Sequence, residues 1–429
     1  MGEVETKAGS SRRVDRIAIT LSISSLLFFT LASIVPEINT DRYGQIALTN
    51  LLPFAKNILS ASGPLYTIAL LLSGVIVLHW LVSRHKYREF DENGFCGSPG
   101  SQARIWFPYI AAWFLSAGFG AVQGATIYAL VSVFMTGSAS QMLDRRAVGR
   151  HLDGILKWPI RAVVVSSLVF GLIAHGRAFA PYAVWPGGWF VGADRLQGVL
   201  PHPNTLGWIA ALGVIVEILY RRSKIGMLFA GLAALALVLS GSRTASISLM
   251  LGVLGVILLA VSRRSHSAKI FSRFLAPIAV VLVLVFAIAD GVSADSFNGR
   301  QVTWDAAIKA FAANWLTGSG PGAYLAPDQL VASVPYAHNQ ILQTAAELGL
   351  FGLICLTLHS ISLIRFVKNG GNSTLGVALV IMWFVMFAFE NPLRFASTGF
   401  FPQVFFFQLA IHLASNGGRN SVISKLGGS

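Results

Sequence analysis

His338 and Glu347 are polar side chains placed where acid–base chemistry is conceivable. His338 lies at the centre of the longest polar interruption in an otherwise apolar sequence, the stretch from Ser293 to Leu353. A long apolar helical pattern follows, and the positive end of its dipole should keep the imidazole neutral, as a general base requires. A packing or interfacial role is the alternative for His338. For Glu347, about two turns into the helix, we expect support of the neighbouring loop rather than catalysis.

Three arginines are candidates for binding an anion. Arg243 lies in LSGSRTAS, a tight turn between two apolar runs that leaves no room for a solvated loop, and Arg195 and Arg300 lie in polar stretches. A guanidinium group binds phosphate oxygens in bidentate fashion and stays charged in a partly desolvated site. The alternatives are an interfacial anchor for Arg243 and structural ion pairs with Asp194, Asp295 or Asp305.

Several further motifs have a structural reading beside the functional one. HPN at His202–Asn204 precedes an apolar run, and a proline suits the first helical position, so we favour helix entry for this motif over substrate contact by His202 or Asn204. Asn339 is expected to be a supporting residue of the site beside His338. GSGPGAY at 318–324 predicts a turn in which the backbone approaches another segment or a ligand closely, and it lacks the lysine of a phosphate-binding P-loop. Sugar stacking and the interfacial aromatic belt are both open for Trp304, Trp315, Tyr324 and Tyr336.

The elements that must position these residues are membrane-spanning helices. With 54% hydrophobic and 12% charged residues in 429, the chain is unlike a soluble domain. Apolar runs long enough for a bilayer core of roughly 30 Å recur along the whole length. We therefore predict an all-α polytopic membrane protein with one integral domain over 1–429. Its two cysteines, Cys96 and Cys355, have no metal spacing and imply no disulfide framework. About twelve spans are expected: 17–35, 62–82, 105–118, 121–137, 159–174, 205–220, 225–240, 244–261, 271–289, 340–364, 374–389 and 398–414.

The distribution of basic residues sets the orientation of these spans. If the amino terminus is cytoplasmic, most Lys and Arg residues fall on the cytoplasmic side, as the positive-inside rule favours. Both termini are then cytoplasmic, and a large, partly helical loop over 290–339, between the ninth and tenth helices, is periplasmic. The net charge of +14 needs no nucleic acid as a partner, because basic loops beside anionic lipid account for it. The basic residues left on the outer side are Arg42, Lys56, Arg177, Arg195, Arg243, Arg300, Lys309 and Arg394.

The second half of the chain resembles the bacterial O-antigen ligase and polymerase superfamily. The resemblance rests on GRQVTWDAAIKAFAANWLTGSGPGAY followed by HNQILQTAAELGLFG, in which GR, GxGPG, HN and a downstream ExG occur in the family's order. HPNTLG and GSRTAS are similar to upstream signatures of the same family. The first third of the chain is similar only in its hydrophobicity.

This resemblance implies a glycosyltransferase acting on the periplasmic face of the bacterial inner membrane. The donor would be O-antigen linked to undecaprenyl diphosphate, and a ligase would transfer it to the lipid A core oligosaccharide. His338 matches the family's essential histidine, and Arg195, Arg243 and Arg300 match basic positions thought to engage the diphosphate. The resemblance further implies a metal-independent reaction without a cofactor, and direct displacement predicts inversion at the anomeric carbon. A polymerase that joins lipid-linked repeats is the main alternative, and a transporter of lipid-linked glycans is a weaker one.

Overall fold

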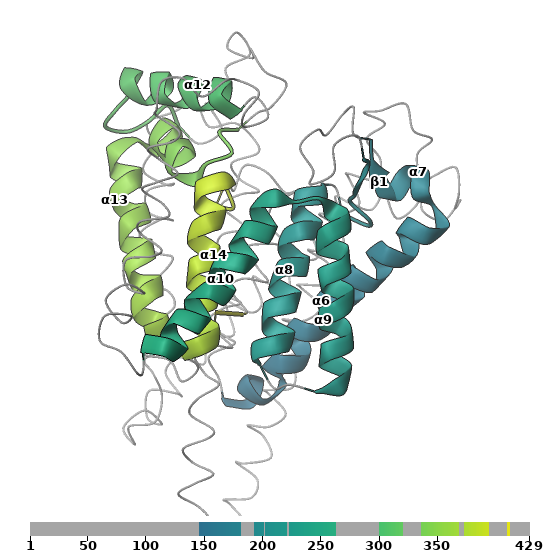
Figure 1. Cartoon of the computed structure of the whole chain (residues 1–429). Helices are drawn as coiled ribbons and strands as arrows, with labels where there is room; N and C mark the ends of the chain where they lie inside the picture. Colours follow the sequence, from purple (N-terminus) through teal and green to yellow (C-terminus); the bar gives the residue numbers. More distant parts are fainter. Residues whose placement is uncertain are drawn as a thin grey trace, which may run out of the picture. The chain divides into compact units, whose positions relative to one another are not determined.

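Helices dominate the part of the chain that the structure describes (Figure 1). The structure, a computed structural model, describes residues 146–181, 193–200, 202–220, 223–262, 300–320, 336–368, 373–393 and 410–411. The predicted spans between residues 17 and 137, the span 271–289, most of the span 398–414, and the residues Cys96, Asp295 and Tyr324 lie outside these ranges.

Most predicted spans that fall on described residues are helices with nearly the predicted bounds. The elements are α6 (Arg146–Ile173), α7 (His175–Ala178), β1 (Phe179–Ala180), β2 (Arg195–Leu196), α8 (Pro203–Leu219), α9 (Lys224–Ser240), α10 (Arg243–Ser262), α12 (Arg300–Ala313), α13 (Gln340–Lys368) and α14 (Ser373–Phe389). Helix α12 confirms that the long polar segment is partly helical. Local apolar periodicity was therefore sufficient to locate these helices.

Two local features differ from the prediction. Helix α6 begins at Arg146 and contains Pro159 in its interior, whereas the predicted span began at that proline. The apolar pattern missed the first part because its residues are largely polar, yet they continue the same helix. The short strands β1 and β2 pair antiparallel, with Phe179 opposite Leu196, so the described fold is not strictly all-α.

Three of the described helices are long and apolar enough to cross a membrane. These are the stretches 156–173, 243–260 and 340–367, within α6, α10 and α13. Three shorter apolar helices, α8, α9 and α14, accompany them. The described residues thus include helices suited to a polytopic membrane protein, while the full number of predicted spans is not covered by them.

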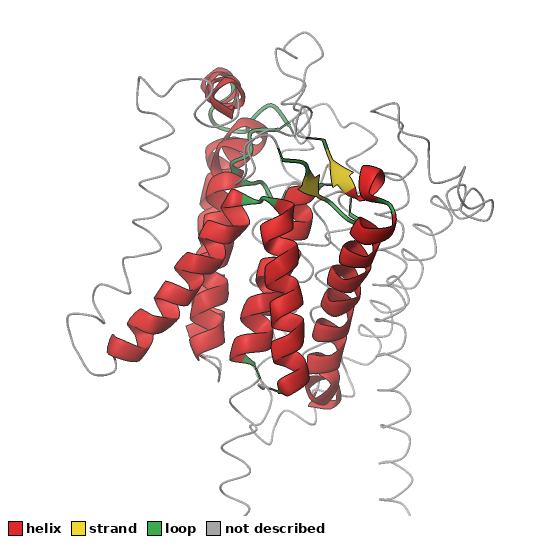
Figure 2. Ribbon diagram, turned by 45° about the vertical axis from the view of Figure 1, so that its right-hand side comes forward, coloured by secondary structure: helices red, strands yellow, loops and turns green. Residues whose placement is uncertain are grey.

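Helix α8 is the centre of the packing. It is buried from Pro203 to Glu217 and contacts α9, α10 and α14. Figure 2 shows the described helices side by side, with the two short strands near one end of them. Glycines permit close contact elsewhere: a Cβ on Gly255 of α10 would lie 2.1 Å from the Ile381 side chain of α14. Helix α13 packs against α12 and α14, and β2 packs against α8 and α9. This packing brings several helix ends, and the polar residues at them, to one end of the bundle.

The opposite end of α8 carries a buried ion cluster. Glu217 is 3% exposed, and Arg161 of α6 donates to its two carboxylate oxygens over 2.7 and 3.0 Å. Lys157 Nζ lies 3.6 Å from the same carboxylate and donates to the carbonyl of Tyr220, which ends α8. The cluster fixes α6 against the end of α8 where the positive-inside rule expects basic residues. Among the described residues, Lys157 onward forms one unit, and 146–156 belongs to a second.

Candidate active site

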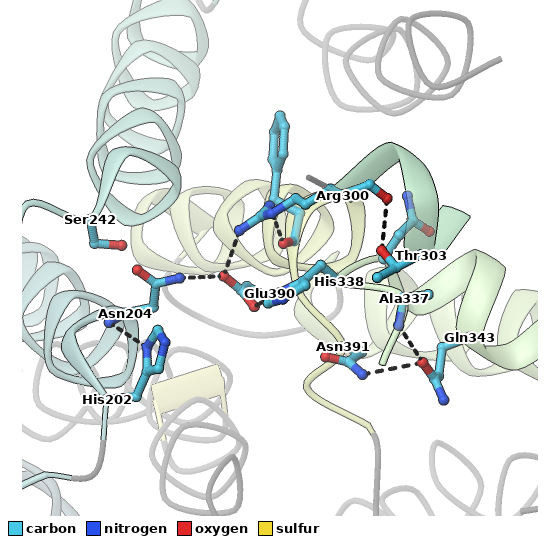
Figure 3. Close-up of polar contacts among 12 residues, drawn as sticks. His202, Asn204, Ser242, Arg300, Thr303, Ala337, His338, Gln343, Glu390 and Asn391 are labelled. Atoms are coloured by element: carbon cyan, nitrogen blue, oxygen red, sulfur yellow. Dashed lines mark hydrogen bonds and ion pairs between the residues drawn. The ribbon is translucent and has the colours of Figure 1, made fainter. Parts of the chain in front are cut away.

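Glu390 is the centre of the polar site, although the sequence analysis did not identify it. It follows α14 directly and is completely buried. Its Oε1 accepts from Asn204 Nδ2 over 2.8 Å and from Arg300 Nη2 over 3.4 Å. Its Oε2 lies 3.3 Å from His338 Nδ1 (Figure 3). Residues from α8, α12, α14 and the segment before α13 therefore meet at one carboxylate.

Arg195 orients the asparagine that contacts this carboxylate. From strand β2, its Nε donates over 2.9 Å to the carbonyl of Ser240 at the end of α9, and its Nη2 donates to Asn204 Oδ1. Because the oxygen of the Asn204 amide faces Arg195, its NH2 group must face Glu390. Arg195 is buried, and burial lowers its pKa to about 10, with Arg300 and Arg243 adding to the effect and Glu390 opposing it. It therefore remains charged at neutral pH.

Arg300 joins the first turn of α12 to the end of α14. Its Nη1 donates over 2.7 Å to the carbonyl of Phe389, and its Nη2 contacts Glu390. The Arg300 carbonyl accepts from Thr303 Oγ1 over 2.7 Å, a bond local to the first helical turn. The partner of Arg300 is thus Glu390 rather than the expected structural partner Asp305, which is exposed.

Arg243 is the most exposed of the three candidate arginines. Gly241 ends α9 in the left-handed conformation, and Ser242 Oγ accepts from the Ala245 amide at the start of α10. These two residues make the tight turn that the GSRT sequence indicates, and Arg243 becomes the first residue of α10. Arg243 is close enough to Arg195 to lower its pKa, but its own side chain is exposed.

His338 has an unusual backbone conformation for a residue with a side chain. Its φ is 48°, in the left-handed region, where a non-glycine residue carries a strain cost of roughly 1–3 kcal/mol. The neighbouring residues hold it there: the Ala337 amide donates to Gln343 Oε1 over 2.8 Å, and Asn339 Nδ2 donates to the Ala388 carbonyl over 3.0 Å. The Tyr336 ring packs edge-on against the imidazole at 4.3 Å. Strain retained by surrounding contacts is characteristic of functional positions.

Asn339 and two glutamines fasten the start of α13 to the end of α14. Asn339 Oδ1 accepts from the amides of Ile341 and Leu342, which makes it the cap of α13. Gln340 Oε1 accepts from the Leu393 amide over 2.8 Å. Gln343 Oε1 accepts from the Ala337 amide and, more weakly, from Asn391 Nδ2 at 3.5 Å. His338 is consequently held beside Glu390 by contacts on both sides of it.

His202 has the helix-entry geometry that the HPN motif predicts. It caps α8, its Nδ1 accepts from the Asn204 amide over 2.9 Å, and Pro203 follows in the first turn. Nδ1 must be unprotonated to accept this bond. Burial lowers the pKa of His202 to about 3, and Arg195, His338 and Arg300 act in the same direction while Glu390 opposes them. His202 is thus neutral at physiological pH.

Glu390 is ionised at physiological pH despite its burial. Burial alone raises the pKa of a carboxyl group, but the hydrogen bond from His338 and the positive charge of Arg300 oppose it, and the pKa falls to about 2. The site therefore combines a fixed carboxylate with guanidinium groups at neutral pH. The negative charge of Glu390 favours a protonated His338 ring, which is opposite to the effect expected from the helix dipole alone.

Glu347 and the glycine-rich turn connect α12 with α13. Helix α13 is broken at Gly349, whose φ is 63° and ψ is −159°. The amides of Leu350 and Phe351 donate instead to the carbonyls of Trp315 and Leu316, over 2.7 and 3.2 Å. The carbonyls left in the helix are satisfied by the turn: Ala346 accepts from Ser319, and Glu347 accepts from Gly320, over 2.9 and 3.0 Å. Residues 315–320, which make these hydrogen bonds to α13, are called the backbone clip.

The clip brings backbone against backbone, as GSGPGAY predicted. A Cβ on Gly318 would lie 2.3 Å from the Glu347 carbonyl group, and one on Gly349 would lie 2.5 Å from Leu316. The Glu347 side chain is buried and accepts from Gln343 Nε2 over 2.7 Å. Glu347 therefore supports the residues around His338 and does not contact Glu390 in the described network.

Trp304 does not have the exposure that sugar stacking requires. It is 2% exposed and packs in a small core with Ala307, Ala337 and Ala346. This core joins α12 to the segment that carries His338. Trp315, in contrast, is 56% exposed on the clip.

The sequence around Glu390 contains a pattern that indicates a functional residue. The FENPL sequence at 389–393 puts a carboxylate, an amide and a proline directly after a strongly apolar span. A charged residue at the end of a span is costly unless it has partners, so it is itself a functional hypothesis. Among the described residues, no group of three His, Cys, Asp or Glu side chains is placed to hold a metal ion.

Together these observations define a class: a helical membrane protein whose helix ends assemble a strained histidine, a buried carboxylate and three arginines. Residues 228–357 match the family model described as O-Antigen ligase. This match supports the resemblance of the second half of the sequence to the O-antigen ligase superfamily, over the matched residues. The search of curated proteins found no match to the chain.

The matched region carries only part of the site. It contains Arg243, Arg300 and His338, whereas Arg195, Asn204 and Glu390 lie before or after it. The contacts of Figure 3 thus join residues of the family domain to residues contributed by α8 and the end of α14.

Proposed function

We propose that the protein is a glycosyltransferase that transfers O-antigen from undecaprenyl diphosphate to the lipid A core oligosaccharide. The observation that carries the proposal is the meeting of His338 with Arg195 and Arg300 around Glu390, within and beside an O-antigen ligase domain. The site is proposed to face the periplasm at the inner membrane, with both chain termini in the cytoplasm. The Lys157–Arg161–Glu217 cluster at the other end of α8 is consistent with that orientation.

The reaction needs one base and concentrated positive charge. The acceptor hydroxyl oxygen bonds to the anomeric carbon of the donor sugar and gives its proton to His338. The bond from that carbon to the diphosphate oxygen breaks, and its electron pair leaves with the diphosphate. Direct displacement inverts the anomeric configuration. His338 is partly exposed, at 12% of its side chain, so that a hydroxyl group can approach it.

The three arginines are proposed to stabilise the diphosphate in different ways. Arg195 and Arg300 are engaged with protein groups, so they contribute mainly a fixed positive field. Arg243 is exposed at the first residue of α10, next to Arg195, and is the best placed to bind the diphosphate directly. Charge that develops on a leaving group in such a preorganised site is stabilised by several kcal/mol, or about 3 for a single donor in comparable enzymes.

The test is glycan transfer by the purified protein in nanodiscs, with a chelator present. The wild type is compared with His338→Asn, because asparagine tolerates the left-handed backbone at this position better than alanine does. Transfer from the polyprenyl-diphosphate donor to lipid A core should occur in the wild type and fall at least about a hundredfold in the variant. Full activity in a folded His338→Asn protein would remove the histidine from the mechanism.

The same assay separates the ligase from the polymerase and the transporter. A polymerase would lengthen the lipid-linked glycan and leave the core unmodified. A transporter would move the donor across a vesicle membrane and leave every glycosidic bond unchanged. The ligase is preferred because the matched domain is described as an O-Antigen ligase.

A further inference from the structure

We propose that Glu390 is a positioning residue for this transfer: it holds the proton of the neutral His338 ring on Nδ1, so that Nε2 receives the proton of the acceptor hydroxyl. The inference rests on the proposed function and adds to it a residue outside the matched family region. Glu390 acts through His338 and does not touch the reacting atoms.

The hydrogen-bonding capacity of the two groups determines the tautomer. An ionised carboxylate can only accept, so a hydrogen bond between Glu390 Oε2 and His338 Nδ1 requires the proton to be on Nδ1. In the neutral ring the lone pair is then on Nε2. If the proton were on Nε2, two acceptors would face each other at 3.3 Å in a buried position.

Glu390 itself has little freedom to turn away. Its Oε1 is held by the Asn204 amide, whose orientation is fixed by Arg195, and by Arg300. The carbonyls of Phe389 and Ala388, the last two residues of α14, accept from Arg300 and Asn339, respectively. The carboxylate is therefore fixed by three other elements before any substrate binds.

The charges around His338 come from every element packed on the site. Glu390 after α14 favours a positive imidazole, and Arg300 of α12 and Arg195 of β2 are positive charges that interact with the same carboxylate. His202 at the start of α8 is neutral at physiological pH, and Arg243 of α10 acts on Arg195. Tyr336 contributes a ring contact. Among these groups Glu390 alone is negative, so it offsets the charge that His338 gains on taking the proton.

The carboxylate stays ionised throughout the reaction. The acceptor proton moves to Nε2, the new bond forms between the acceptor oxygen and the anomeric carbon, and the diphosphate leaves with its electron pair. The resulting imidazolium carries a proton on each nitrogen, and Glu390 stabilises it without accepting one. In a comparable carboxylate–histidine arrangement, loss of the charge lowers kcat about 10⁴-fold because the wrong tautomer is populated.

The decisive variant is Glu390→Gln, with Glu217→Gln as its matched control. Glu217 is also a buried carboxylate paired with an arginine, but it lies at the opposite end of α8. In Glu390→Gln we expect kcat to fall at least about a hundredfold with KM for the donor changed less than about threefold. The acid limb of the pH–rate profile should move to lower pH, because the carboxylate that stabilises the imidazolium is gone. Glu390→Asp keeps the negative charge, so the acid limb of its pH–rate profile should lie at the wild-type pH. Its activity should be partial.

The control distinguishes positioning from a purely structural role. Glu217→Gln should lower the melting temperature and leave kcat per folded protein and the pH profile unchanged. If Glu390→Gln keeps its kcat, or if its kcat falls with an unmoved acid limb, Glu390 does not position the base.

A measurement that does not require glycan transfer tests this inference separately from the proposed function. The chain has nine histidines, and with ¹⁵N-histidine labelling the difference spectrum between wild type and His338→Asn identifies the His338 ring in nanodiscs. We expect a protonated Nδ1 and an unprotonated Nε2 in the wild type, and a mixture of tautomers in Glu390→Gln. Such spectra from a protein that transfers no glycan would support the contact and reject the proposed function. Equal spectra in both proteins would overturn the inference.

Discussion

At the scale of single residues, the three arginines that look equivalent in the sequence are in different environments. Arg195 is buried and donates one hydrogen bond to the Ser240 carbonyl and another that orients the Asn204 amide. Arg243 is exposed at a helix start. Burial, rather than residue type, therefore separates the arginine that supports the site from the one whose side chain is exposed.

Arg195→Ala and Arg243→Ala should have contrasting effects. Loss of Arg195 leaves the Ser240 carbonyl and the Asn204 amide oxygen without this donor, so we expect the free energy of unfolding to fall by about 1–3 kcal/mol. Loss of Arg243 should leave the melting temperature within about a degree and lower kcat/KM for the donor about tenfold to a hundredfold, because it removes a charged contact to phosphate.

The measurements are thermal unfolding in detergent and steady-state kinetics with the purified variants. Lys309→Ala is the control, because Lys309 is an exposed cation on α12 outside the Glu390 network. A stable Arg195→Ala protein with impaired donor binding would reverse the assignment of the two arginines.

At the scale of elements, the backbone clip joins the segment after α12 to the middle of α13, where that helix is broken at Gly349. Its hydrogen bonds replace those that the helix loses at Gly349, so the break leaves these amides and carbonyls satisfied. Helix α12 and the segment bearing His338 are thereby linked twice, by the clip and by the small core around Trp304. Irregular backbone in a membrane span is stable when its polar groups are satisfied inside the protein.

Alanine at Gly349 or Gly318 should be strongly destabilising. Both glycines have positive φ, and a Cβ would lie 2.5 Å (Gly349) or 2.3 Å (Gly318) from backbone atoms. Movement of a side chain cannot relieve such a clash. We expect a loss of more than about 2 kcal/mol in the free energy of unfolding, together with a loss of transfer activity. Circular dichroism melting and the yield of monodisperse protein would measure it.

Gly231→Ala is the matched control for these substitutions. Gly231 lies within α9, and a Cβ there has no neighbour within 4 Å. Alanine should therefore be neutral or stabilise the helix by up to about 1 kcal/mol. Equal melting temperatures for all three alanine variants would contradict the proposed role of the clip.

At the scale of the whole molecule, the stability of one end of the bundle depends on two groups, His202 and Glu390, that are unprotonated in the folded protein. The pKa of His202 is lowered from 6.5 to about 3, and that of Glu390 is lowered from 4.5 to about 2. In both cases the unfolded chain binds protons at a higher pH than the folded protein does. Folding is therefore favoured above the unfolded pKa values, and this contribution is lost as pH falls.

We expect the melting temperature to decline below pH 6.5, where unfolded His202 gains a proton, and more steeply below 4.5, where Glu390 contributes as well. His202→Asn should keep the helix cap and remove the decline between these two values, because asparagine caps helices without titrating. Melting curves across this range in a fixed detergent would check it. An unchanged decline in His202→Asn would assign the acid sensitivity to other groups.

The sequence alone determined the membrane class, the positions of most described helices, and the identity of His338 and the arginines as candidates. These follow from local signals: apolar periodicity locates a helix, and the residues that make up a short motif such as HN or GSRT are adjacent in the sequence. The GSGPG turn could likewise be predicted to approach other backbone closely, because glycine has no Cβ.

Only the tertiary structure decided which of these residues meet. Glu390 binds Asn204 across 186 positions of the sequence and His338 across 52, and no local pattern specifies such contacts. Its burial is tolerated because donors from several elements offset the cost of removing a charge from water. The separation of buried Arg195 from exposed Arg243, and the carboxylate that fixes the histidine, are therefore properties of the packed helices.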